Sequence, residues 1–99
     1  MVEVKKYTIK FTEETKKKIH KLDPQIKLII KKAIESLAEN PYRGKPLSYD
    51  LAGLYSLRTA DYRIIYRVKG EELVIIVISI GHRREVYKKL KALIDKETK

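Results

Sequence analysis

The chain has 99 residues, of which 43% are hydrophobic and 36% charged. This length predicts one domain over residues 1–99 with one modest core, because chains divide into separate cores only when they are considerably longer. The sequence has no cysteine, which excludes disulfides, a thiol nucleophile and cysteine-bound zinc or iron–sulfur sites. The histidines, His20 and His82, match no metal-binding spacing, so we expect neither a metal nor a cofactor.

The charge balance points to a polyanion as the partner. Lysine and arginine total 23 against 13 acids, a net charge of +10, and nucleic acid is the commonest partner of so basic a domain. The alternative is a solvated Lys- and Glu-rich surface of the kind found in heat-adapted proteins. The longest purely apolar run, 73–78, is six residues long. A bilayer-spanning helix needs about 20, so we expect no membrane interaction and a cytoplasmic protein.

The N-terminal part of the chain predicts a strand and two helices. Apolar and polar residues roughly alternate over 2–11, as in a half-buried strand. Thr12, followed by two glutamates, is typical of a helix N-cap and predicts a short helix that ends near Leu22. Asp23-Pro24 is a second start signal. The helix that follows carries an apolar stripe and is expected to end at Asn40-Pro41, because proline disfavours helical geometry in the residue before it.

The C-terminal part predicts three strands and a helix after a loop over 42–53. The strands are expected over 54–59, 62–68 and 72–80, joined by short hairpin connections. The last of them is rich in valine and isoleucine on both faces, so we expect it to be the central strand. A helical pattern returns over 84–96. The order strand, helix, helix, three strands, helix predicts an α+β fold in which a helical hairpin packs against one antiparallel sheet.

Arginine, tyrosine and histidine side chains gather in two segments of the predicted sheet. One segment holds Arg58, Tyr62 and Arg63, and the other is the run 81–87, with the sequence GHRREVY. Because the segments lie on or beside neighbouring strands, their side chains can converge. The planar fork of arginine suits phosphate, tyrosine and imidazole can position or transfer a proton, and an aromatic ring can stack on an unpaired base.

Each of these residues also has a purely structural interpretation. Arg58 and Arg63 could be exposed positions on strand faces, and Tyr87 could be an aromatic at the core edge with its hydroxyl in water. His20 lies in a lysine-rich helix and is expected at the surface. The lysines over 16–32 are expected to form a solvated helix face, with steering of RNA as the alternative.

Four stretches of the chain together resemble the RelE/ParE superfamily of toxins, and RelE-type members in particular. They are GKPL at 44–47, DLAGL at 50–54, SLRTADYRIIY at 56–66 and IGHRREVY at 80–87. The resemblance covers nearly the whole chain and implies a RelE-like fold. It also implies a toxin of a type II toxin–antitoxin system that enters the ribosomal A site and cuts mRNA there. The 2′-hydroxyl of the RNA would attack the adjacent phosphate, so no metal is needed to supply a nucleophile.

The resemblance carries roles to individual residues of this chain. Arg63, in the Asp-Tyr-Arg pattern, is expected to bind and stabilise the scissile phosphate. Arg83 is expected to stabilise charge near the leaving oxygen, and Tyr87 to stack on a base or to orient or deprotonate the attacking hydroxyl. Arg58 is a further expected phosphate contact. We add His82 on chemical grounds as the general acid or base, since histidine changes its charge between about pH 5 and 8.

The basic residues Lys45 and Arg84 are predicted to bind RNA beside this site. The well-studied bacterial members carry two lysines on the strand before Asp-Tyr-Arg, where this chain has Leu54 and Ser56. Lys45, on the preceding loop, is the residue that could substitute for one of them. Other branches use a loop glutamate as the base, and the nearest carboxylate in this chain is Asp50.

Two other functions stay open on the sequence alone. A ParE-like gyrase inhibitor shares the fold but acts by binding a protein, and it would need neither Tyr87 nor converging arginines. A catalytically weak relative would only occupy ribosomal RNA or an antitoxin. All of these interpretations imply a cognate antitoxin, whose charge would complement that of the toxin and whose helices would displace the C-terminal helix over 84–96. The alternative for that helix is permanent docking on the core.

Overall fold

The computed structural model describes residues 6–82, 85–88 and 90, and its fold is of the predicted α+β class. Residues 85–88 and 90 are helical, in agreement with the start of the predicted C-terminal helix, and we name them the C-terminal turn. The other residues predicted for that helix, and residues 2–5 of the predicted first strand, lie outside the described ranges. None of the helices in the described part of the chain has the length and hydrophobicity needed to cross a bilayer.

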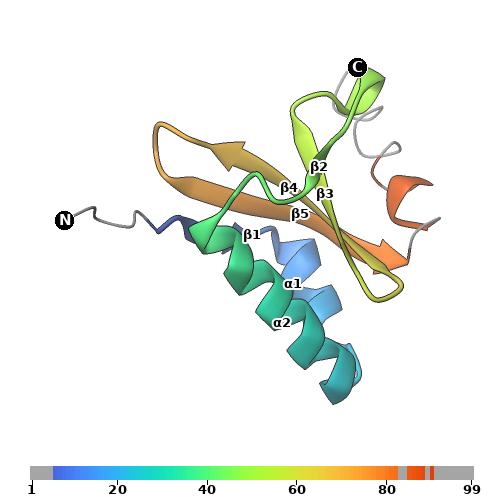
Figure 1. Ribbon diagram of the computed structural model, residues 1–99. Helices are drawn as coiled ribbons and strands as arrows, with labels where there is room; N and C mark the ends of the chain where they lie inside the picture. Colours follow the sequence, from blue (N-terminus) through green and yellow to red (C-terminus); the bar gives the residue numbers. More distant parts are fainter. Residues whose placement is uncertain (1–5, 83–84, 89, 91–99) are drawn as a thin grey trace.

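The structure confirms both predicted helix starts. β1 (Thr8–Phe11) leads into α1 (Glu13–His20), and the Thr12 hydroxyl before α1 accepts a hydrogen bond from the Thr15 backbone N–H at 3.2 Å. α2 (Pro24–Glu39) begins at its proline and ends before the Asn-Pro stop signal. Figure 1 shows the two helices together on one side of the sheet. The local start and stop signals therefore suffice to predict this helical hairpin.

The sheet has five strands in the order β1-β5-β4-β3-β2. β3 (Leu54–Thr59), β4 (Tyr62–Lys69) and β5 (Val74–His82) are joined in antiparallel pairs, as predicted. β1, however, pairs in parallel with β5, so the sheet is mixed and the prediction of a wholly antiparallel sheet is wrong. Parallel pairing needs a long connection, and the helical hairpin and three strands between β1 and β5 provide one.

The sheet also differs from the sequence pattern in its details. The middle strand is β4 and not β5, because β1 and β5 occupy one edge of the sheet. β5 begins later than predicted, at Val74, since Leu73 belongs to the turn and has a φ of 55°. The predicted loop contains a two-residue strand, β2 (Lys45–Pro46), and a short 3-10 helix, η1 (Tyr49–Leu51). Proline is tolerated in β2 because an edge strand has one unpaired side.

Hydrophobic clusters cover both faces of the sheet. The larger cluster lies between the sheet and the helices and contains Ile30, Ile34, Leu37, Ile64, Tyr66, Ile75, Val77 and Ile80. The smaller cluster attaches the C-terminal turn to the other face and contains Leu54, Ile65, Val86 and Leu90. Among the described residues, more of the buried apolar side chains, and therefore more of the hydrophobic stabilisation that they provide, lie on the helix side.

Tyr66 holds the segment that leads into β2. Its side chain is fully buried, and its hydroxyl accepts a hydrogen bond from the Gly44 N–H at 2.9 Å and donates one to the Pro41 carbonyl at 2.8 Å. Burial raises the pKa of the Tyr66 hydroxyl, which favours the neutral form that can donate. A Cβ on Gly44 would lie 2.6 Å from this hydroxyl, so glycine is needed there. These contacts position Lys45, the next residue, on the edge of the sheet.

Candidate functional site

The pairing register places four polar residues on one face of the sheet. Lys45 of β2 lies opposite Ser56 of β3, and Arg58 of β3 lies opposite Arg63 of β4. Directly paired residues share a face, and so do residues two apart on a strand. Leu57, between Ser56 and Arg58, packs against the core on the helix side. The four polar side chains therefore start from the face opposite to α1 and α2, and Arg58, which is exposed near the end of β3, also lines a hollow beside α2.

The C-terminal turn brings a tyrosine to this same face. Val86 and Leu90 are buried in the smaller cluster and fix the turn against the sheet. The hydroxyl of the neighbouring Tyr87 lies 2.9 Å from Oγ of Ser56, at hydrogen-bond distance. Ser56 is itself buried, so the Tyr87 hydroxyl is tied to the sheet instead of pointing only into water.

These residues line a cleft of about 660 Å³, which we name the tyrosine cleft. Its polar side chains include those of Lys45, Ser56, Arg58, Arg63 and Tyr87. Lys45 and Arg58 are exposed, whereas Arg63 and Tyr87 are half-buried. Permanent cations beside a fixed hydroxyl suit an anionic ligand that carries its own hydroxyl group, and an RNA phosphodiester is such a ligand.

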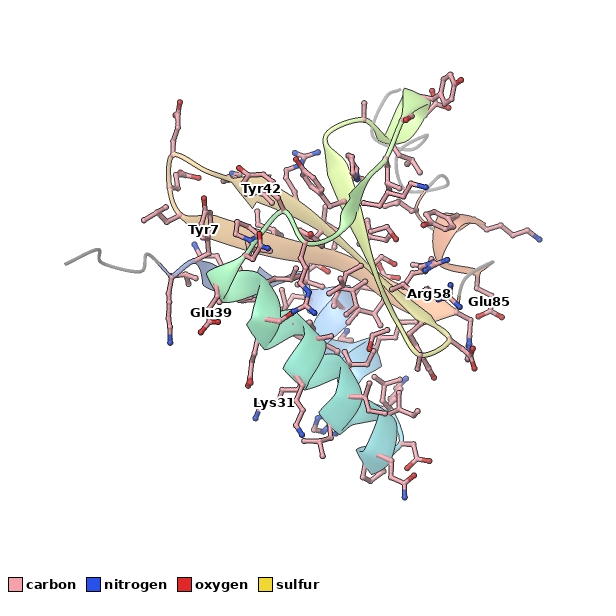
Figure 2. The ribbon with its side chains drawn as sticks, viewed as in Figure 1. Tyr7, Lys31, Glu39, Tyr42, Arg58 and Glu85 are labelled. Carbon is pink, nitrogen blue, oxygen red and sulfur yellow. The ribbon has the colours of Figure 1, made fainter. Side chains whose placement is uncertain are left out.

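Arg58 and Arg63 also line a second hollow, of about 360 Å³, which we name the histidine cleft. Its other polar and aromatic side chains are those of Asp61, Tyr62, His82 and Glu85. The rings of Tyr62 and His82 lie 4.5 Å apart between centroids and are tilted by 33°. The cleft lies where β3 ends, β4 begins and β5 ends. Figure 2 shows Arg58 and Glu85 at this same end of the sheet.

The structure therefore divides the predicted site between two clefts. Arg58, Arg63 and Tyr87, which belong to the two segments expected to converge, line the tyrosine cleft together with Lys45. His82 lies in the histidine cleft and is related to the others through the two shared arginines. The reason is the register: His82 pairs with Tyr62, one position beyond Arg63 on β4, and therefore belongs to the opposite face of the sheet.

Several other predicted residues lie apart from these clefts. Arg83 and Arg84 fall outside the described residues. Asp50 is exposed in η1 and lines neither cleft. His20 is exposed, as expected. Within the described ranges, no group of three or more histidine, cysteine, aspartate or glutamate side chains is arranged to hold a metal ion.

Two residues near the site were not predicted from the sequence. From the sequence, Ser56 is notable only because bacterial relatives have a lysine at that position. In the structure, the Ser56 hydroxyl is hydrogen-bonded to the Tyr87 hydroxyl. Its spacing of two from Arg58 is the signal that could have placed it on the same face. The second residue is Lys18 of α1, whose ammonium would lie 3.2 Å from a Cβ placed on Gly81. No local pattern brings α1 to the end of β5.

Comparisons with known proteins agree with this architecture. Residues 6–87 match the family described as ParE toxin of type II toxin-antitoxin system, parDE. The chain is 35% identical over 85 residues to Toxin RelG of Mycobacterium tuberculosis, covering 84% of this chain and 98% of the relative. It is 34% identical over 89 residues to the mRNA interferase toxin RelE of Escherichia coli, covering 82% of this chain and 90% of that protein.

A solved structure supports the same relationship. The crystal structure of the toxin–antitoxin complex RelBE2 from Mycobacterium tuberculosis superposes with a TM-score of 0.75 at 34% identity, covering 82% of this chain and 95% of that chain. Residues 6–87, which match the toxin family, include the whole sheet and both clefts. On these grounds, the chain belongs to the RelE/ParE family of toxins of type II toxin–antitoxin systems.

Proposed function

We propose that this toxin is a ribosome-dependent mRNA endoribonuclease. The observation that carries the proposal is the tyrosine cleft, where two arginines, a lysine and a tyrosine from separate elements converge. The Escherichia coli relative is named an mRNA interferase, which supports the same activity for this chain. A toxin that only bound the surface of gyrase would not need such a convergence.

Arg58 and Arg63 bind the scissile phosphate in this proposal. They are direct partners in an antiparallel ladder, where Cβ atoms lie about 4.5–5.5 Å apart. Like charges that start from paired positions repel each other, an anion bound between the two guanidinium groups offsets that repulsion, and each group can donate two hydrogen bonds to phosphate oxygens. Because negative charge grows on the phosphate in the transition state, the arginines bind that state more tightly than the substrate and lower the barrier.

Proton transfer is assigned to the aromatic residues on either side of the arginines. The 2′-oxygen bonds to phosphorus while the bond to the 5′-oxygen breaks, which leaves a 2′,3′-cyclic phosphate and a 5′-hydroxyl. Tyr87, tied to Ser56, orients the 2′-hydroxyl or accepts its proton. His82, in the adjoining cleft, donates a proton to the leaving 5′-oxygen. The nucleophile belongs to the RNA, so the reaction needs no metal-bound water.

The remaining basic residues supply charge around this centre. Lys45, opposite Ser56 on the next strand, replaces one of the strand lysines of the bacterial relatives, because its side chain starts from the same face. Arg83 stabilises the leaving oxygen, and Arg84 binds the RNA strand. The last two roles rest on the family pattern of the sequence.

A cognate antitoxin is the second proposed partner, in the cytoplasm where ribosomes are found. One similar solved structure, RelBE2 from Mycobacterium tuberculosis, is a complex of toxin and antitoxin. The net charge of +10 favours an acidic wrapping segment, since complementary charge speeds the encounter. The C-terminal turn is the element that an antitoxin helix would displace, because the smaller cluster attaches it to the sheet.

Primer extension on a messenger in a translation extract, with and without ribosomes, tests the nuclease. The variants are Arg63→Ala and, as a matched control, Arg67→Ala, which removes an exposed arginine of the same strand that lines neither cleft. We expect wild type and Arg67→Ala to cut only with ribosomes present, and Arg63→Ala to cut at least about tenfold less. An uncut messenger with translation still running would overturn the nuclease, and a supercoiling assay would then test gyrase inhibition.

A further inference from the structure

The histidine cleft contains more than the proposed proton donor. It adjoins the tyrosine cleft, and the two arginines that line both clefts lie between them. A phosphate bound to Arg58 and Arg63 has one nucleotide on each side along the RNA chain. With one of these nucleotides directed toward Tyr87, the other is directed toward Tyr62 and His82. The arrangement therefore provides a place for a second base next to the cleaved bond.

Tyr62 and His82 form a surface on which a base can stack. Their rings are 4.5 Å apart between centroids and tilted by 33°. Tyr62 packs against the larger core cluster and is half-buried, whereas His82 is exposed, so the pair is anchored on one side and accessible on the other. Stacking on aromatic side chains is a common way to bind an unpaired RNA base. The cleft volume of about 360 Å³ lies within the range of roughly 300–1,000 Å³ of small-molecule sites.

Asp61 and Glu85 give this cleft a second chemical character. Both are exposed acids, one in the turn between β3 and β4 and the other in the C-terminal turn. The salt bridges within the described ranges, Lys16–Glu13 and Lys69–Glu72, involve neither of them. Carboxylates repel a phosphate backbone but accept hydrogen bonds from the amino groups of bases. Two acids in a site that otherwise carries positive charge are therefore suited to bind a nucleobase of the RNA and not its phosphate backbone.

We propose that the histidine cleft reads the base on one side of the scissile phosphate and disfavours uracil there. Adenine, cytosine and guanine each carry an exocyclic amino group that Asp61 or Glu85 can accept from. Uracil has no exocyclic amino group and only the N3 imide hydrogen as a donor on that edge, so an acid placed to accept from an amino group faces a carbonyl oxygen of like partial charge. Tyr62 and His82 hold the base by stacking, and the acids select it. This inference rests on the proposed nuclease function and adds base selection to it.

The test uses ribosomes programmed with messengers that differ only in the base on either side of the cut. Wild type is compared with Asp61→Asn, Glu85→Gln and the double variant, because an amide keeps the shape but can donate as well as accept. Glu71→Gln is the matched control, since it removes an exposed acid from the turn between β4 and β5, which is remote from the cleft. For one of the two sides of the cut, we expect wild type and the control to cut the messenger that carries uracil there at least about tenfold more slowly than the messengers that carry another base. The double variant should bring this ratio to within about twofold.

The possible outcomes separate the two proposals. A wild type that cuts without preference on either side, or a double variant that keeps the full preference, would overturn base reading and leave the nuclease intact. A wild type that cuts no messenger would overturn the nuclease and the base selection together. Circular dichroism of each variant checks the fold, and the two acids are exposed, so we expect native spectra.

Discussion

The two faces of the sheet differ in what covers them. On one face, α1 and α2 cover the larger cluster and exclude water from it (Figure 1). On the other face, as far as the described residues show, the C-terminal turn covers a small cluster, and polar side chains beyond it line a cleft. Because successive residues of a strand point to opposite faces, β3 and β4 serve both at once. In the tyrosine cleft, stability and chemistry are therefore carried by alternate residues of the same strands, whereas Tyr62 and His82 occupy helix-side positions at the end of the sheet.

The tyrosines Tyr66 and Tyr87 show the same contrast. The Tyr66 hydroxyl is buried on the helix side and bonded to backbone groups, so its role is structural. The Tyr87 hydroxyl is bonded to a side chain at the open face, in a cleft that also holds arginines. Four variants, in order of decreasing expected effect, test whether the two faces are as independent as this contrast implies.

Leu37→Ala is expected to have the largest effect. Leu37 is fully buried in the larger cluster, and the cavity left by its truncation should lower the free energy of unfolding by about 2–5 kcal/mol. Leu28→Ala on the same helix is the control, because Leu28 is 54% exposed. Urea denaturation measures both. The folded Leu37→Ala protein should still cut mRNA at the wild-type rate, and a loss of cutting by folded protein would contradict the independence of the faces.

Gly44→Ala is expected to disturb both faces at once. The new Cβ would lie 2.6 Å from the Tyr66 hydroxyl and 3.0 Å from the Ser56 carbonyl, and such overpacking costs about 1–3 kcal/mol of unfolding free energy. The shift of Lys45 should also reduce cleavage. Gly70→Ala is the control, since its nearest contact would be at 3.6 Å. Equal thermal melting temperatures for the two variants would show that the hydroxyl contact does not hold the loop.

Tyr87→Phe is expected to act on chemistry alone. It removes the hydroxyl bonded to Ser56 and should reduce ribosome-dependent cleavage at least about tenfold. Ser56→Ala keeps the tyrosine but frees its hydroxyl, so it should cause a smaller loss. Tyr49→Phe is the control, because Tyr49 is 96% exposed and lines neither cleft. If native-like Tyr87→Phe cuts as fast as wild type, Tyr87 is only an aromatic at the core edge.

The titration of Tyr66 is expected to give the smallest effect, a pH dependence of stability that is confined to alkaline solution. Burial raises the pKa of Tyr66 in the folded protein above its ordinary value of 10.0. The neutral hydroxyl therefore contributes stability that is fully present below about pH 10 and is lost as the pH rises toward the folded pKa, because the unfolded chain releases this proton first. Urea denaturation between pH 9 and 11 should show a shallower decline for Tyr66→Phe than for wild type. Parallel declines would contradict the assignment.

The elements that the sequence predicted well are those with local signals. Thr12 and Pro24 mark helix starts through contacts within one turn, and β3 has the predicted bounds. The two-residue β2 and the parallel pairing of β1 with β5 were missed, because they depend on partners far away in the chain. The same limit applies to the site. Its arginines and Tyr87 are visible as residue types, whereas the bond from Ser56 to Tyr87 requires the docked turn.

The sequence by itself determined the α+β class, the order of the main elements, the basic character and the family of this protein, since all of these follow from short-range patterns and composition. Only the tertiary structure decided that Lys45 lies opposite Ser56, and that His82 lies in a cleft apart from Tyr87. Strand register sets these relations, and a shift of one residue would exchange the two faces. Register depends on the packing of both faces together, which no local segment of the chain contains.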